Sequence, residues 1–140
     1  MGARELLEEI KSLDYKIKIL TERIIELEAM LQPGIEYDKI GSVPRNSYHP
    51  DNRVNIIYKL SDTKEDLILR RAELYAIKSQ LTKAISKMEN KAHIEIIVRR
   101  YYNHQRWEKI SKEMGYSIRQ CFRLNEQAIA ELDEIINDGT

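Results

Sequence analysis

Apolar residues in the N-terminal part of the chain recur in alternating steps of four and three. One set consists of Ile10, Ile17, Ile24 and Leu31, and the other consists of the leucines at positions 6, 13, 20 and 27. This is the heptad repeat of a coiled-coil helix, with the first set at its a positions and the second at its d positions. Pro33 and Gly34 follow, and both residues favour the end of a helix. The pattern predicts a long helix from about residue 5 to residue 32.

A second apolar repeat of seven residues occupies the middle of the chain. Its members are Leu60, Leu67, Leu74, Leu81 and Met88, with Ile57, Ile77 and Ile85 widening the stripe. It predicts a second long helix over about residues 53–90. Residues 33–52 hold all three prolines and have no helical period, so they predict a connecting loop. The two helices could bury their seams against each other in an antiparallel hairpin, or residues 6–31 could pair with a second copy in a homodimer.

The C-terminal third predicts shorter helices. Asn90 is a good cap for a helix from Lys91 to about Tyr102, whose apolar face comprises Ile94, Ile97, Val98 and Tyr101. A second helix starts near Gln105 and ends at Gly115. Ser117 then caps a third helix, which continues through Ile136.

The last two of these helices have the spacing of a helix-turn-helix that begins at Trp107. Its apolar positions would be Ile110, Met114, Tyr116, Cys121 and Leu124; its small residue at the helix crossing would be Ser111, and its left-handed turn residue would be Gly115. A plain packing corner is the alternative. The expected fold is all-α, with residues 1–90 forming a long helical hairpin or coiled coil and residues 91–140 forming a sigma-like helix-turn-helix domain.

Charge is balanced over the whole chain but not along it. The 140 residues include 23 Lys and Arg and 23 Asp and Glu. Between Lys91 and Arg123, eight residues are basic (91, 99, 100, 106, 109, 112, 119 and 123) and three are acidic (95, 108 and 113). After Arg123, five residues are acidic (126, 131, 133, 134 and 138) and none is basic. The basic excess therefore coincides with the predicted helix-turn-helix.

The predicted third helix would place its first two turns in the major groove of double-stranded DNA. The candidate base-contacting residues are Ser117, Ile118, Arg119, Gln120 and Arg123. Arginine pairs with guanine, glutamine with adenine, and an isoleucine methyl contacts the thymine methyl. Arg106, Lys109 and Lys112 on the preceding helix would contact phosphates.

Several other classes of function find little support in the sequence. The single Cys121 excludes an internal disulfide and faces the predicted core, and the three histidines (His49, His93 and His104) have no metal-ligand spacing. A phosphate-binding glycine loop and a nucleophile with a nearby base are both missing, so we expect no enzyme, cofactor or metal. No apolar run is long enough to span a membrane, and a cytoplasmic location is expected.

The segment RRYYNHQRWEKISKEMGYSIRQCFRLNEQAIAEL, residues 99–132, resembles the C-terminal, promoter-reading domain of sigma factors. It is still more similar to phage-encoded regulators of the RinA and ArpU type, through its Arg-Tyr helix end, its Trp-Glu-x-Ile helix start and its Gly-Tyr-Ser turn. Upstream, the loop IGSVPRNSYHPDNRV between two helices also fits this arrangement. Asn125 stands where the family often has His, and Cys121 where it usually has Val.

The resemblance implies a phage or prophage transcription regulator in a bacterial host. RNA polymerase is a candidate further partner, and the sequence leaves open whether it is contacted. Two alternatives remain from the residues: a DNA-packaging protein like the small terminase subunits, and a coiled-coil adaptor that does not bind DNA.

Overall fold

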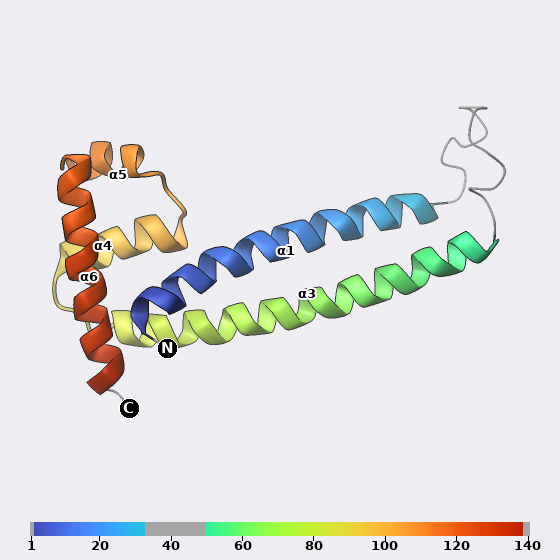
Figure 1. Ribbon diagram of the computed structural model, residues 1–140, viewed down its shortest axis with the longest axis horizontal. Coiled ribbons are helices and arrows are strands. Elements are labelled where there is room, and N and C mark those ends of the chain that lie inside the picture. Colours follow the sequence, from blue (N-terminus) through green and yellow to red (C-terminus); the bar gives the residue numbers. More distant parts are fainter. Residues whose placement is uncertain (1, 33–49, 139–140) are drawn as a thin grey trace. The chain divides into compact units, whose positions relative to one another are not determined.

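The computed structural model describes residues 2–32 and 50–138, and this part of the chain is all-α (Figure 1). Its elements are α1 (Ala3–Leu31), α3 (Pro50–Ile85), α4 (Lys91–Ile97), the π-helix η2 (Val98–Tyr102), α5 (Trp107–Met114) and α6 (Ile118–Asp138). The predicted all-α fold is confirmed. The predicted loop, with His49, falls largely outside the described residues. None of the described helices is long and apolar enough to cross a membrane.

The chain divides into two compact units, and both long helices contribute to each. The first unit comprises residues 1–14 and 73–140, and the second comprises residues 15–72. The predicted boundary at residue 90 therefore lies inside the first unit. The C-terminal helices share this unit with the first turns of α1 and the last turns of α3.

In the second unit, the α1 and α3 segments run in opposite directions (Figure 1). The heptad seams are buried within the single chain at Ile24, Leu27 and Leu67. Ile57, which was predicted to widen the seam, is instead exposed, and Ile56 is half-buried in its place. A heptad seam recurs in alternating steps of four and three, and counting back from Leu67 in these steps gives residues 63, 60 and 56. Residue 56 therefore faces the seam, and residue 57 does not.

Because this seam is already covered within one chain, the predicted homodimer through residues 6–31 would need another face of α1. The homodimer itself stays a prediction.

The hydrophobic core of the first unit joins residues from both ends of the sequence. It contains Ala3, Leu6, Leu7 and Ile10 of α1, Leu81 and Ala84 of α3, Met88 just after α3, and Ile96, Ile97, Ile110, Cys121, Ala128, Ile129, Leu132 and Ile136 of the C-terminal helices. Leu7 is not part of the heptad seam, yet it is completely buried. The start of α1 is thus covered over a wider arc than a two-helix seam requires.

The second long helix ends earlier than the predicted residue 90. Its last regular residue is Ile85, and the N–H groups of Lys87 and Met88 donate to carbonyls three residues back, at 3.0 Å in each case. This tighter turn lets Met88 remain in the core while the chain changes direction. The predicted cap is confirmed, since the Asn90 side-chain oxygen accepts the N–H groups of Ala92 and His93 at 3.0 and 3.2 Å.

Glu131 on α6 holds this connection in place. Its carboxylate lies 2.7 Å from Nδ1 of His93 and accepts the backbone N–H of Glu89 at 3.2 Å. The hydrogen bond with His93 is the main cause of a lowered pKa for Glu131. The connection between α3 and α4 is thereby tied to the middle of α6.

Replacing Leu7 by Ala should destabilise the protein by about 2 to 5 kcal/mol, because it would leave a cavity in the core. The exposed Ile19 on the same helix provides the control, and Ile19→Ala should change stability by no more than about 0.5 kcal/mol. Urea unfolding followed by circular dichroism measures both values. Equal effects of the two substitutions would contradict the role given to the start of α1.

The Glu131→Gln variant should be less stable than the wild type near neutral pH. A carboxyl group whose pKa is lower in the folded protein stabilises it above the unfolded pKa, and this contribution disappears as the pH falls through the folded pKa. The difference in unfolding free energy between wild type and variant should therefore shrink below about pH 4.5, the ordinary value for the group. A difference that stays constant down to acid pH would show that ionised Glu131 has no stabilising role.

Candidate nucleic-acid interface

A tight turn at residues 115–117 joins α5 to α6. Gly115 has φ 76°, in the left-handed region, and its N–H donates to the carbonyl of Ser111 at 3.0 Å. The N–H of Tyr116 donates to the same carbonyl at 3.2 Å, and the Ser111 hydroxyl donates back to the Tyr116 carbonyl. The predicted left-handed glycine is confirmed, and Ser111 stabilises the turn through both its backbone carbonyl and its hydroxyl.

Ser117 and Gln120 form a reciprocal capping box at the start of α6. The Ser117 hydroxyl accepts the N–H of Gln120 at 3.1 Å, and the Gln120 side-chain oxygen accepts the N–H of Ser117 at 2.9 Å. The predicted Ser117 cap is confirmed. Gln120, a predicted adenine contact, already uses its acceptor oxygen to close the helix end.

The apolar positions counted from Trp107 are met with one exception. Ile110 and Cys121 are completely buried, and Met114 and Leu124 are half-buried beside them. Burial raises the pKa of the Cys121 thiol, which keeps it protonated at neutral pH. Tyr116 was predicted to be a core residue, but its side chain is exposed. Its N–H and C=O are both directed at Ser111 inside the turn, and this leaves the side chain outside.

Two arginines of the π-helix η2 contact α5. Arg99 pairs with Glu95 at 2.8 Å and also with Glu113 of α5. The Arg100 guanidinium lies 4.6 Å from the centre of the Trp107 ring and donates to the Gln105 carbonyl at 3.0 Å. Two of the basic residues counted in the sequence thus serve to join η2 to α5.

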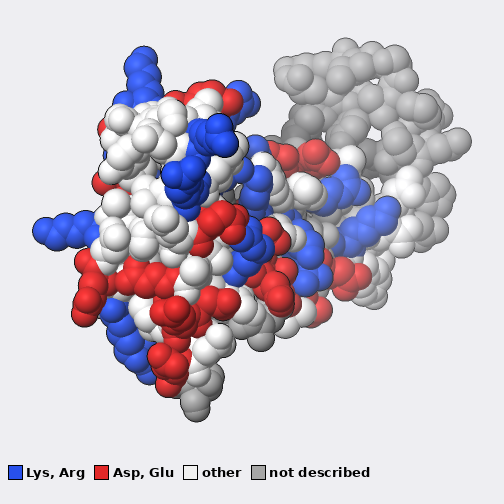
Figure 2. Space-filling model, turned by 60° about the vertical axis from the view of Figure 1, so that its left-hand side comes forward, with Lys and Arg blue, Asp and Glu red and all other residues white. Residues whose placement is uncertain are grey.

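All eight predicted DNA-contacting residues are exposed on the first unit. They are Arg106, Lys109, Lys112, Ser117, Ile118, Arg119, Gln120 and Arg123. Lys109 lies 3.9 Å from Glu113, whereas within the described residues no carboxylate lies within ion-pair distance of Arg119 or Arg123. Figure 2 shows basic side chains projecting from the upper part of this unit and acidic side chains gathered below.

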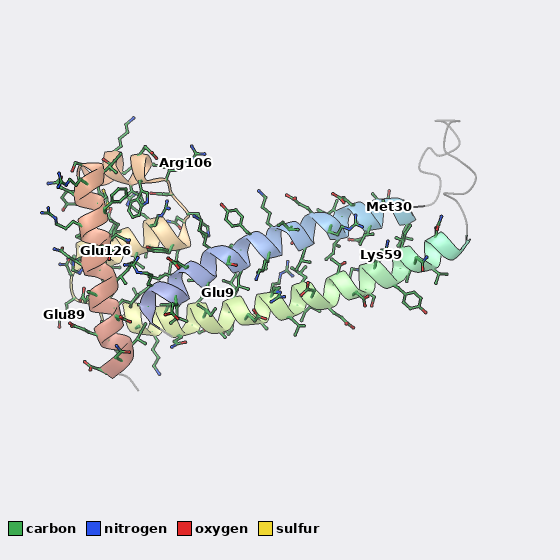
Figure 3. All side chains as sticks on the ribbon, viewed as in Figure 1. Glu9, Met30, Lys59, Glu89, Arg106 and Glu126 are labelled. Atoms are coloured by element: carbon green, nitrogen blue, oxygen red, sulfur yellow. The ribbon has the colours of Figure 1, made fainter. Side chains whose placement is uncertain are left out.

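Glu126 is the nearest acidic residue along α6 to these arginines. It follows Arg123 by three positions, a spacing that would allow an ion pair on the helix surface. Its carboxylate instead pairs with the Arg4 guanidinium of α1 at 2.5 Å. Figure 3 labels Glu126 on α6 and Arg106 just ahead of α5. Glu126 is thus not an ion-pair partner of Arg123 in the part of the chain that the structure describes.

Phe122 is a surface residue of this region that was not among the predicted site residues. Its side chain is 47% exposed, and its ring meets the edge of Trp107 at 90° with 5.0 Å between the ring centres. Phe122 follows Ile118 by four residues, so both lie on one face of α6. The spacing places both residues on one face, but it does not say whether that face is buried or exposed.

A cavity of about 300 Å³ lies beside this aromatic pair, lined by Arg4, Glu8, Lys11, Arg100, Tyr101, Trp107, Phe122, Asn125 and Glu126. Asn125 is 5% exposed, and its amide nitrogen donates to the Tyr101 hydroxyl at 3.0 Å. Its side-chain oxygen is buried without a hydrogen-bond partner in the structure. Across residues 2–32 and 50–138, no group of three or more His, Cys, Asp or Glu side chains could hold a metal ion.

No family model matches the chain, and searches of curated proteins and of solved structures also find no match.

Gly115→Ala should destabilise the protein by about 1 to 2 kcal/mol, the usual cost of placing an L-residue with a Cβ in the left-handed region. An added Cβ would meet no atom within 4 Å, so the cost would come from the backbone angle alone. Gly115→Asn should cost less, because asparagine adopts this conformation more readily. Thermal and urea unfolding compare the variants, and equal stability of the alanine variant and the wild type would contradict a strained turn.

Proposed function

We propose that this protein is a sequence-specific, double-stranded DNA-binding transcription regulator of the phage RinA and ArpU type, with α6 as its recognition helix. The observation that carries the proposal is the pair Arg119 and Arg123. Both are exposed on the first two turns of α6 and have no carboxylate within ion-pair distance in the described residues. Exposed arginines at this place in a helix suit contacts to guanine bases and to phosphates.

The local geometry supports the proposal because it holds the start of α6 in a fixed orientation. Its first turn is closed by the capping box of Ser117 and Gln120 and is fixed to α5 by the turn at Gly115. A recognition helix benefits from this, because base contacts need side chains held at a defined orientation to the groove. Arg106, Lys109 and Lys112 provide exposed positive charge nearby for phosphates.

The ion pairs of the acidic residues on α6 give further support to the proposed DNA binding. Glu126 pairs with Arg4 and Glu131 with His93, so two carboxylates beyond the basic turns already have partners. A duplex approaching the start of α6 would meet Arg119 and Arg123 first. Binding, without bond-making, would be the mechanism, and RNA polymerase is a candidate further partner.

Arg119→Ala and Arg123→Ala should each weaken binding to a selected duplex by about 1 to 3 kcal/mol while leaving the helical content intact. The exposed Lys59 on α3 (Figure 3) provides the control, and Lys59→Ala should bind like the wild type. The site would first be selected from a random duplex library, and its affinity would then be measured across a salt series. Affinity should fall steeply with salt, since phosphate contacts release counterions.

Unchanged affinity in both arginine variants would refute α6 as the recognition helix. If no sequence is enriched and no salt-dependent binding appears, the coiled-coil adaptor becomes the better interpretation. A closed ring larger than a dimer in light scattering would favour the DNA-packaging alternative.

A further inference from the structure

Large apolar side chains are exposed at one place in the C-terminal helices. Within the described residues 91–138, the exposed ones are Tyr116, Ile118 and Phe122, with exposed fractions of 40%, 39% and 47%. Every other large apolar side chain in this range is buried or half-buried. Exposed apolar groups gathered in this way mark an interaction surface.

Ile118 and Phe122 alternate along α6 with Arg119 and Arg123, which have no carboxylate within ion-pair distance among residues 2–32 and 50–138. Residues 118 and 122 form one row along α6 and residues 119 and 123 form the next, because side chains four apart are neighbours on a helix. The surface is therefore a two-by-two arrangement of apolar and cationic groups. A purely apolar partner would have to desolvate both guanidinium groups without compensation.

The Phe122 ring is held in place although half of it is exposed. Trp107 contacts it edge to face, and the Arg100 guanidinium covers the Trp107 ring at 4.6 Å. Such aromatic and cation–π contacts have a preferred geometry, so they limit the rotation of the ring. A fixed apolar group loses little conformational freedom on binding, which favours a role in recognition.

We infer that Ile118 and Phe122 contact the 5-methyl groups of thymine in the major groove; this rests on the proposed function. The thymine methyl is the apolar group that base pairs present in the major groove, and isoleucine and phenylalanine match it in size and polarity. Arg119 and Arg123 on the adjacent row would engage guanine or phosphate at the same time. The bound sequence should accordingly contain thymine beside the positions that these arginines contact.

The test replaces each thymine of the selected duplex in turn by deoxyuridine, which pairs identically and lacks only the methyl group. For each contacted methyl, the wild type should bind the substituted duplex about fourfold more weakly, the loss expected for one buried apolar carbon. Phe122→Ala and Ile118→Ala should bind thymine duplexes more weakly and should bind thymine and uracil equally at the positions that they contact.

Two further variants distinguish the loss of a methyl contact from a general loss of affinity. Arg123→Ala should bind more weakly but keep the wild-type discrimination between thymine and uracil, because it leaves the apolar row intact. Phe122→Leu keeps an apolar side chain, so it should retain discrimination. Ile118→Ala, at a side chain that is 39% exposed, serves as the test if Phe122→Ala loses its helical content.

The results can distinguish failure of the thymine contact from failure of the proposed DNA binding. Sequence-selective binding by the wild type without any difference between thymine and uracil would overturn the inference and leave the proposed function standing. Discrimination that persists unchanged in Phe122→Ala and in Ile118→Ala would also overturn it. Failure to bind any selected duplex would instead overturn the proposed function.

Discussion

The first unit depends on how the start of α1 docks against α6. The Asp133 carboxylate accepts the N–H of Ala3 at 2.9 Å, which satisfies one of the unpaired donors at the N-terminus of α1. One residue on, Arg4 pairs with Glu126, and below these polar contacts Leu6, Leu7 and Ile10 enter the core. At the other end of this segment, Asp14 lies 2.6 Å from Nε2 of His104, whose φ of 54° is in the left-handed region. The N-terminal residues are thus an integral part of the unit that holds α5 and α6.

Because of this docking, the two halves of α6 have different surroundings. In its acidic half, Glu126, Glu131 and Asp133 contact Arg4, His93 and the start of α1, so their charges serve to assemble the unit. In its basic half, Arg119 and Arg123 have no carboxylate within ion-pair distance in the described residues and lie on the surface. One helix therefore combines a half that is anchored and a half that is available to a polyanion. The same anchoring keeps Glu126 from neutralising Arg123, which stands three positions before it.

The turn between α5 and α6 fixes the direction of the available half. Its geometry depends on the conformation of Gly115, on three hydrogen bonds centred on Ser111 and on two between Ser117 and Gln120. Behind it, Arg99 and Arg100 of the π-helix bind α5 through Glu113 and Trp107. π-helical turns of this kind often occur at functional sites. Here the two arginine side chains hold η2 against α5.

Local order was largely determined by the sequence. Heptad spacing predicted both long helices, Asn90 and Ser117 predicted two caps, and Gly115 predicted the left-handed turn, because each of these signals acts within one or two helical turns. Other features were decided by contacts between distant segments. The sequence alone gave no reason for Leu7 to be completely buried, for α3 to end at Ile85, for Glu126 to pair with Arg4, or for Tyr116 to leave the core. The exposure of Phe122 belongs to the same group, since α6 has apolar residues on several faces and only its packing against α1, α4 and α5 determines which face remains on the surface. Sequence spacing records which residues can share a helical face, whereas the surroundings of that face depend on segments up to 130 positions apart, as between Ala3 and Asp133.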